Sequence, residues 1–227
     1  MIERMTNNLV LRLDKYRLVF WDFDGVIKES VNVKADAFYS LFLPYGMTVA
    51  QQVVAHHLAY GGLSRFKKIE NALQQYVGTE PAPELVRELA NQFGNLVREK
   101  VVEAAWVPGV ESLLRENPYG QIFVLATGTP QEEIKWILGQ LGLADAFQAV
   151  YGTPIDKADA ISDALKRFQV GPEECVFFGD SRTDMDAAKA WGVPFVLRET
   201  DHATALFADH MGPRIRDFSE VLHDTIA

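Results

Sequence analysis

Short apolar runs alternate with amphipathic stretches along most of the chain. The runs are rich in aromatic and branched residues, as is typical of strands buried on both faces of a sheet. They lie at 16–21, 121–126, 147–151, 175–178 and 195–197, and helical periodicity occurs between them at 108–116, 130–141, 157–168 and 183–191. Strands that alternate with helices predict an α/β fold with a Rossmann-like parallel sheet at its core.

The interval 29–105 departs from this alternation, because it contains amphipathic stretches but no convincing strand. These stretches lie at 34–42, 50–58, 64–76 and 83–103, and turn-forming Pro and Gly residues separate them. We therefore expect residues 1–28 and 106–227 to form an α/β core domain and residues 29–105 to form an inserted helical cap. A short closing helix is expected at 217–226.

Composition narrows the class of protein. The 227 residues are 48% hydrophobic, which argues against intrinsic disorder, and carry a formal net charge of −9. Net negative charge disfavours nucleic acid and anionic membranes as partners, since both bind clustered Lys and Arg. We found no apolar run of membrane-spanning length and no signal-peptide core in residues 1–8. With the single Cys175, these features predict a cytoplasmic protein.

Chemically distinctive side chains follow four of the predicted strands. In chain order they are Asp22 and Asp24, Thr127 and Gly128, Lys157, and Asp180 and Asp184. Because ligands bind beyond the carboxyl ends of parallel strands, we expect these residues to converge. The carboxylates require a cation and the lysine requires an anion. Mg²⁺ with a phosphoryl group meets both needs, since all candidate ligands are oxygens and no His/Cys pair has zinc spacing.

Each of these segments also has a simpler explanation when it is taken alone. Residues 22–25 could be a bare turn, and residues 127–130 could be an ordinary helix start. Residues 181–184 could cap a helix. Lys157 begins a predicted helix, where the helix dipole disfavours positive charge, and this unfavourable position hints at a function. The simpler explanation is that Lys157 is solvated, as most exposed lysines are.

Together, the segments resemble the four ordered motifs of the haloacid dehalogenase-like (HAD) hydrolase superfamily. The matching residues are Asp22-Phe23-Asp24-Gly25-Val26, Thr127, Lys157 and Gly179-Asp180-Ser181-x-x-Asp184. The resemblance covers nearly the whole chain. The 29–105 insertion resembles the helical cap of the subgroup that includes phosphoglycolate phosphatases and β-phosphoglucomutases.

The resemblance implies a role for each motif residue in phosphoryl transfer. Asp22 would be the nucleophile that forms an aspartyl-phosphate, and Asp24 would be the general acid and base. Thr127, the Gly128 N–H group and Lys157 would bind the phosphoryl oxygens.

The resemblance also implies the metal site. Mg²⁺ would bind to the Asp22 carboxylate, the Asp24 main-chain carbonyl and Asp180. Asp184 would lie behind these ligands and orient waters or Lys157. Gly25 would allow the chain to turn sharply beside the phosphate.

Differences between this chain and related families limit the type of reaction that we expect. Family dehalogenases lack the second aspartate and act without metal, so the presence of Asp24 favours phosphate esters. Phosphonate-cleaving relatives carry a Schiff-base lysine in the cap. Asp24 disfavours that reaction, but Lys34 lies early in the cap, near the place of such a lysine, so the reaction is not excluded. β-Phosphoglucomutases tend to have a serine and lysine at the second motif and a histidine in the first cap helix. This chain has Thr129-Pro130 and Lys34 there, which favours a phosphatase.

The local basic cluster of the chain lies in the predicted cap, at Arg65, Lys67 and Lys68. Its surroundings resemble the Gly-x-Ser-Arg stretch of β-phosphoglucomutases and related phosphatases, in which the arginine meets the substrate phosphate. We therefore expect Arg65 and Lys68 to contact the substrate. The alternative is a solvated helix start capped by Ser64. The adjacent His56 and His57 cannot form an i, i+4 metal pair and are expected at the surface or between helices.

The sequence thus favours a Mg²⁺-dependent phosphatase acting on a small phosphate ester of the sugar phosphate or phosphoglycolate type, as a monomer or weak dimer. One alternative is a phosphosugar mutase of the β-phosphoglucomutase type. The other is a catalytically silent HAD-like binding domain, although every motif position is filled. The sequence does not identify the ester.

Overall fold

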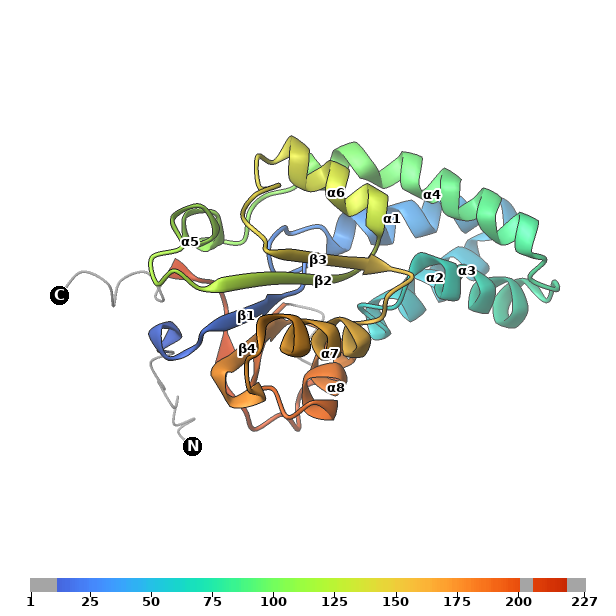
Figure 1. Ribbon diagram of the computed structural model, residues 1–227. Helices are drawn as coiled ribbons and strands as arrows, with labels where there is room; N and C mark the ends of the chain where they lie inside the picture. The colour runs from blue at the N-terminus through green and yellow to red at the C-terminus, as the bar shows by residue number, and fades with distance from the viewer. Residues whose placement is uncertain (1–11, 201–205, 220–227) are drawn as a thin grey trace, which may run out of the picture.

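A single parallel sheet organises the protein (Figure 1). The computed structural model describes residues 12–200 and 206–219. The sheet order is β3-β2-β1-β4-β5-β6. The strands are β1 (Leu18–Trp21), β2 (Ile122–Pro130), β3 (Ala149–Thr153), β4 (Cys175–Gly179), β5 (Phe195–Arg198) and β6 (Arg214–Ile215). The predicted α/β fold with a parallel sheet is confirmed.

Four helices follow β1 before the chain reaches α5 (Val110–Glu116) and then β2, as the sequence predicts. They are α1 (Val31–Phe42), α2 (Met47–Ala59), α3 (Arg65–Ala72), which continues as a π-helical turn at Leu73–Val77, and α4 (Pro83–Glu103). Short 3-10 turns lie at Leu13–Lys15, Leu43–Tyr45 and Pro172–Glu174. The remaining helices are α6 (Gln131–Gln140), α7 (Lys157–Phe168) and α8 (Arg182–Ala190).

Both faces of the sheet are buried. On β1, Val19 and Trp21 belong to the apolar cluster that includes residues of α5 and α6. Leu18 and Phe20 belong to the cluster formed with α7 and α8. All four side chains are fully buried, which explains why the strand is a continuous apolar run. Burial of each large apolar side chain stabilises the fold by roughly 1.5–3 kcal/mol.

Strand β1 lies at the centre of the sheet and so determines where the site forms. Trp21 is in register with Leu125 of β2 and with Phe178 of β4. The residues that follow these three positions therefore emerge at one edge of the sheet. Strands β2 and β3 lie on one side of β1, and strands β4, β5 and β6 lie on the other. The order of the strands thus changes direction at β1, and ligands of open α/β sheets bind at such a switch point.

Residues Thr127–Pro130 lie in β2, whereas the sequence analysis placed them after the strand, at a helix start. The pairing of β2 with β3 shifts register between Ala126 and Pro130, and α6 begins only at Gln131. The residue before a proline favours an extended conformation, and this preference allows β2 to continue to Pro130. The two-residue strand β6 was not predicted, because it is too short to show periodicity. Most of the helix predicted at 217–226 lies outside the described residues.

The chain crosses between the core and the inserted helices at two adjacent points. The Glu29 N–H donates to the Ala105 carbonyl at 2.9 Å, and the Val107 N–H donates to the Ile27 carbonyl at 3.0 Å. Helix α4 also packs against α6, and one apolar cluster includes residues from both parts. The division at residues 28/29 and 105/106 stays a prediction.

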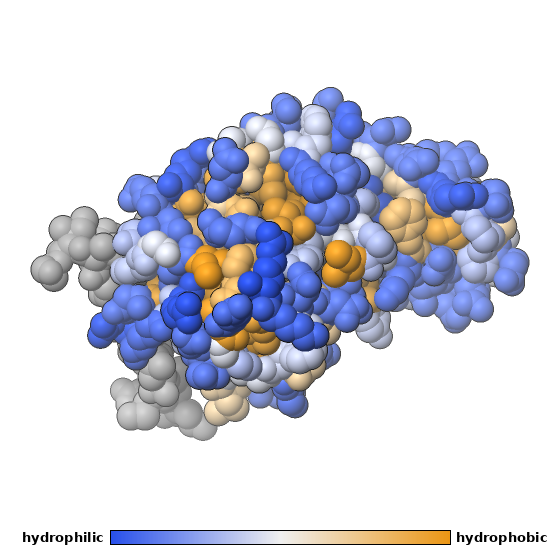
Figure 2. Space-filling model, viewed as in Figure 1, coloured by the Kyte–Doolittle hydropathy of each residue, from blue (hydrophilic) through white to orange (hydrophobic). Residues whose placement is uncertain are grey.

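The surface is mainly hydrophilic on the face shown in Figure 2, with several separate apolar patches. Exposed large apolar side chains in the described residues include Met47, Tyr60 and Met211. Within the part of the chain that the structure describes, no helix has the length and apolarity needed to cross a membrane.

Candidate active site

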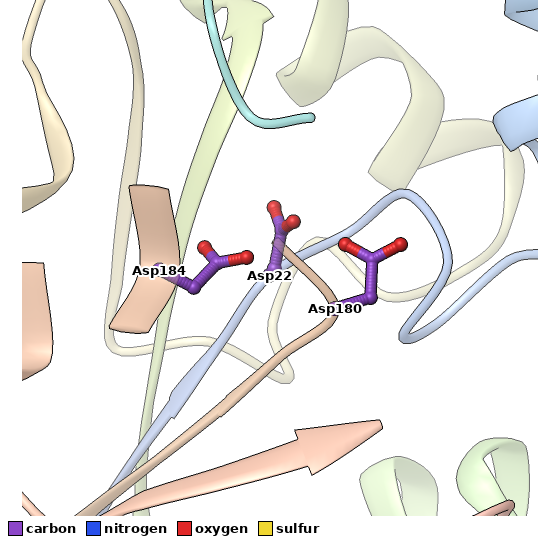
Figure 3. Close-up of side chains that lie close together, drawn as sticks. All are labelled: Asp22, Asp180 and Asp184. Atoms are coloured by element: carbon purple, nitrogen blue, oxygen red, sulfur yellow. The ribbon is translucent and has the colours of Figure 1, made fainter. Parts of the chain in front are cut away.

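Three aspartates meet at the carboxyl edge of the sheet (Figure 3). Asp22 follows β1, Asp180 follows β4, and Asp184 lies in the first turn of α8. One carboxylate oxygen of each lies within 4.8 Å of the others. Asp22 and Asp184 are buried, and Asp180 is partly buried. The sequence prediction that the first and fourth motifs converge is therefore correct in geometry.

Lys157, the first residue of α7, supplies a positive charge to this cluster. Its Nζ lies 2.9 Å from Asp22 Oδ1 and also pairs with Asp184 Oδ1. Burial lowers the pKa of Lys157, but the carboxylates of Asp184 and Asp22 outweigh burial, so the pKa lies above its ordinary value. This lysine is therefore a permanent cation inside the site.

The positive charge of Lys157 does not balance the three carboxylates of the cluster. Burial, aided by the charge of Asp184, raises the pKa of Asp22 to about 7 even though Lys157 is adjacent. Burial and the charge of Asp22 raise the pKa of Asp180 well above its ordinary range. Among the described residues, no donor contacts the Asp180 carboxylate. Oxygen ligands that face one another without enough cations fit Mg²⁺, and Asp22 and Asp180 are the side chains available to bind it.

Asp184 is engaged by the protein at both carboxylate oxygens. Oδ1 accepts from Lys157, while Oδ2 accepts from the Ser181 N–H at 3.0 Å and from Ser181 Oγ at 2.5 Å. Ser181 Oγ in turn accepts from the Asp184 N–H at 3.4 Å and so caps α8, which means that the capping explanation considered from sequence holds for this segment. Asp184 consequently orients Lys157 and the start of α8.

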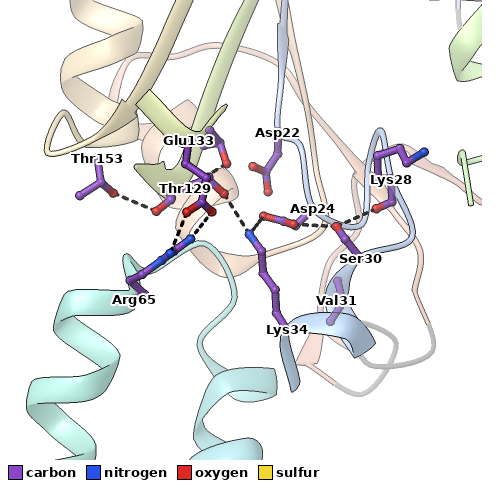
Figure 4. A network of polar contacts seen from close by, with 12 residues as sticks. Asp22, Asp24, Lys28, Ser30, Val31, Lys34, Arg65, Thr129, Glu133 and Thr153 are labelled. Atoms are coloured by element: carbon purple, nitrogen blue, oxygen red, sulfur yellow. Dashed lines mark hydrogen bonds and ion pairs between the residues drawn. The ribbon is translucent and has the colours of Figure 1, made fainter. Parts of the chain in front are cut away.

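The Asp24 side chain contacts residues from the start of α1 (Figure 4). Lys34 Nζ donates to Asp24 Oδ2 at 2.5 Å, and Ser30 Oγ donates to Asp24 Oδ1 at 2.6 Å. Burial tends to raise the pKa of Asp24, but Lys34 and Ser30 together hold it below its ordinary value. Lys34 also donates to Thr129 Oγ1 at 2.9 Å.

These contacts of Lys34 were not predicted. The sequence analysis considered Lys34 only as a position that differs from mutases and as a lysine near that of phosphonate-cleaving relatives. The available signal was the spacing of Ser30 and Lys34, which puts both side chains on one face of a helix that starts close to Asp24.

The second motif lies beside a loop of the inserted region. Thr127 is buried, and its Oγ1 accepts from the Thr129 N–H at 3.2 Å. A Cβ atom at Gly128 would come within 2.6 Å of the Gly62 carbonyl oxygen. Thr183 Oγ1 donates to the Gly61 carbonyl at 2.9 Å. The Gly61–Leu63 loop therefore rests on the core directly over the phosphate-binding segment expected from the sequence.

A cavity of about 70 Å³ lies between the core and the inserted helices. Its core side includes Asp22, Asp24, Gly128 and Asp180, and its other side includes Lys34, His57, Arg65 and Lys68. A larger, more open groove on the other side of the Gly61–Leu63 loop is lined by Thr127 and Lys157, among others, and Gly128 borders both spaces. The structure thus places all the predicted site residues except Asp184 along these two spaces.

Arg65 lines the cavity but is paired with a residue that was not predicted. Its Nη1 donates to Glu133 Oε2 at 2.9 Å, its Nη2 contacts Glu133 Oε1, and the guanidinium lies 4.8 Å from the Phe93 ring centroid (Figure 4). Ser64 caps α3 by accepting from the Lys67 N–H at 3.4 Å. Arg65 is nevertheless only 6% exposed, so it does not belong to a solvated helix start.

Lys68 is buried beside a histidine. Its Nζ lies 2.8 Å from His57 Nδ1 and 3.4 Å from the His57 carbonyl oxygen. Burial, reinforced by the charge of Lys34, lowers the pKa of Lys68 to about 7. His57 packs against Phe38, with ring centroids 5.0 Å apart, as expected for a residue between helices, but it also lines the cavity.

Comparison with known proteins gives a consistent result. A family model described as haloacid dehalogenase-like hydrolase matches residues 16–192. A phosphoglycolate phosphatase of Pseudomonas putida is 28% identical over 187 residues, which cover 79% of this chain and 68% of that protein. A phosphorylated carbohydrates phosphatase of Thermotoga maritima is 26% identical, with 77% of this chain and 81% of that protein covered.

Solved structures are similar in fold. A β-phosphoglucomutase from Clostridium difficile has a TM-score of 0.73 at 18% identity, and the match covers 93% of this chain and 95% of that one. A predicted phosphoglycolate phosphatase from Haemophilus somnus has a TM-score of 0.71 at 20% identity, and the match covers 94% and 100%.

Proposed function

Because the chain belongs to the haloacid dehalogenase-like hydrolase family, we propose that it is a Mg²⁺-dependent phosphatase of small phosphorylated metabolites. The observation that carries this proposal is the position of Asp22. Its buried carboxylate lies at the end of the central strand, 2.9 Å from the Lys157 ammonium and next to the Asp180 carboxylate. A nucleophile for phosphorus, a fixed cation and a metal ligand are thereby present in one site.

Asp22 attacks phosphorus and forms the aspartyl-phosphate. Lys157 lies where its charge can offset the negative charge on the phosphoryl oxygens, and Asp184 holds it there. The Thr127 hydroxyl and the Gly128 N–H donate to the same oxygens. Asp22, Asp180 and the Asp24 main-chain carbonyl would hold Mg²⁺, which would supply further positive charge at the site.

Asp24 moves the protons in both halves of the reaction. It protonates the leaving alcohol and then, as a carboxylate, takes a proton from the water that hydrolyses the aspartyl-phosphate. Lys34 and Ser30 donate to both of its oxygens and hold its pKa below the ordinary value, which favours the carboxylate that acts as the base. The inserted helices therefore orient Asp24 in addition to excluding bulk water.

The expected substrates are esters of the sugar phosphate or phosphoglycolate type. Relatives named as phosphatases of phosphoglycolate and of phosphorylated carbohydrates support this expectation. The likeness to a β-phosphoglucomutase is one of fold, and Thr129 and Lys34 differ from the residues typical of those mutases. A silent binding domain is disfavoured because the catalytic positions are filled.

The proposal is tested by measuring phosphate release from a panel of phosphorylated metabolites with and without Mg²⁺. Asp22→Asn should reduce kcat by at least ~10³-fold, because covalent catalysis requires the carboxylate. Conversion of a sugar 1-phosphate to its 6-phosphate without phosphate release would identify a mutase. Failure to hydrolyse any ester, including p-nitrophenyl phosphate, would support a binding domain.

A further inference from the structure

We propose that Lys68 selects substrates that carry a second anionic group, at the end of the molecule remote from the scissile phosphate. The inference rests on the proposed phosphatase function and specifies its substrate class. The class is a compact phosphate monoester whose alcohol part bears a carboxylate or a second phosphate.

The first step of the argument is a comparison of the three cations that the inserted helices contribute to the cavity. Lys34 is paired with Asp24, and Arg65 is paired with Glu133. Lys68 has no carboxylate within ion-pair distance in the described part of the chain. Its polar partners there are the ring and the carbonyl of His57.

His57 does not neutralise this lysine. Burial, with the charges of Lys68 and Lys34, lowers the pKa of His57 well below its ordinary value, so the ring is neutral. Its Nδ1 accepts from Lys68, while Nε2 lies 3.4 Å from the Val31 carbonyl oxygen. The imidazole therefore positions the ammonium group without supplying a counter-charge.

Burial makes the missing counter-charge significant. Lys68 is only 4% exposed, and an ammonium group removed from water is costly unless an anion accompanies it. Because Lys68 lines the cavity, a ligand in that cavity can supply the anion. The Lys68 ammonium is therefore positioned to donate a hydrogen bond to a negatively charged atom of a ligand in the cavity.

The position of Lys68 relative to the catalytic residues sets the shape of the substrate. Asp22 lies on the core side of the cavity and Lys68 on the opposite side, so one molecule can place a phosphoryl group at the first and an anion at the second. The cavity is small, about 70 Å³, so a short alcohol part fits it better than a long one.

The test compares matched esters that differ in one anionic group. One pair is 2-phosphoglycolate and 2-hydroxyethyl phosphate, which tests a carboxylate. The other pair is 1,3-propanediol bisphosphate and 3-hydroxypropyl phosphate, which tests a second phosphate. The wild-type protein with Mg²⁺ should favour the charged member of at least one pair in kcat/KM, and the pair that shows the preference identifies the anion.

Variants assign the preference to Lys68. Lys68→Met should reduce it ~10- to 100-fold, the effect expected for a charge-assisted hydrogen bond, because kcat/KM should fall much more for the charged member of the pair than for the neutral one. Lys68→Arg should retain part of it. Lys67→Met is the matched control, because Lys67 is the exposed neighbour, and it should behave like the wild type. Lys68→Met should also keep or raise the thermal midpoint, because it removes an uncompensated buried charge, whereas a purely structural lysine would give a loss.

Two outcomes overturn the inference. One is a wild-type protein that hydrolyses neutral and charged members equally well. The other is a Lys68→Met variant that slows both members of a pair to the same extent. The proposed function fails separately, if the wild-type protein releases phosphate from none of the esters, including p-nitrophenyl phosphate.

Discussion

Lys157 lies at the first position of α7, where the helix dipole disfavours positive charge. Its contacts with Asp22 and Asp184 explain why a lysine occupies this position. The unfavourable placement was visible in the sequence and is the reason that Lys157 could be singled out. The two carboxylates that stabilise it were identified separately, and only the fold brings the three together.

Gly25 provides a prediction at the scale of one residue. It adopts a φ of +76°, and a Cβ atom there would lie 2.2 Å from Asp180 Oδ2. Gly25→Ala should therefore displace the Asp180 carboxylate and weaken Mg²⁺ binding at least ~10-fold, measured by titrating activity with Mg²⁺.

Gly78 is the matched control for Gly25. Its φ is +74°, but a Cβ atom there would meet no atom of the described residues within 4 Å, apart from its chain neighbours. Gly78→Ala should incur the same backbone strain, roughly 1 kcal/mol, without any change in the Mg²⁺ titration. Equal Mg²⁺ requirements in the two variants would contradict the role assigned to Gly25.

At the scale of elements, α3 and α6 are joined by the pair Arg65 and Glu133. Both side chains are largely buried, with 6% and 13% of the side-chain surface exposed. Glu133→Gln should lower the free energy of unfolding by roughly 1–3 kcal/mol, since it leaves a buried guanidinium without its counter-charge. Denaturant unfolding measures this change.

Glu132→Gln is the control for that prediction. Glu132 precedes Glu133 on α6, and its ion pair with Lys135 is exposed. Exposed pairs contribute little to stability, so no measurable change is expected. Equal losses in the free energy of unfolding for both substitutions would show that the buried pair of Arg65 and Glu133 does not stabilise the protein more than an exposed pair.

Comparison of the predicted and observed helices and strands shows which of their features are determined by local sequence. Helices α4 and α7 have the predicted bounds, because their apolar periodicity and their ends are local properties. The end of β2 was misplaced, since the strand is extended by pairing with β3 across a register shift. The contacts of Glu133 and His57 could not be predicted, because they depend on how the inserted helices pack against one another and on the core.

For the whole molecule, the balance of charge at the site predicts how stability depends on pH. In the metal-free protein the pKa of Asp22 is raised from 3.8 to about 7. Between these values the folded state binds more protons than the unfolded state. The contribution of Asp22 to stability should therefore fall as pH rises from about 4 to about 7, by at most roughly 1.4 kcal/mol per pH unit, and it is measured as the difference in pH dependence between the wild-type protein and Asp22→Asn.

Mg²⁺ should reverse this trend, because it favours the ionised carboxylates. The rise in thermal midpoint caused by Mg²⁺ should increase with pH across that range, and Asp22→Asn should reduce the increase. Thermal scans at several pH values, with Mg²⁺ or with a chelator, measure both effects. A Mg²⁺ effect that does not vary with pH would contradict the charge assignment.

The paired crossing segments, Ile27–Glu29 and Ala105–Val107, have a consequence for how the protein is built. Since the hydrogen bonds between them hold the two segments side by side, the inserted helices leave and rejoin the core at nearly the same point. Strand β1 needs only those two adjacent segments, whereas Asp24 also needs Ser30 and Lys34 at the start of α1. Beyond the start of α1, the inserted helices can thus differ in length and side chains, and with them in the alcohol they admit, while the sheet keeps its geometry.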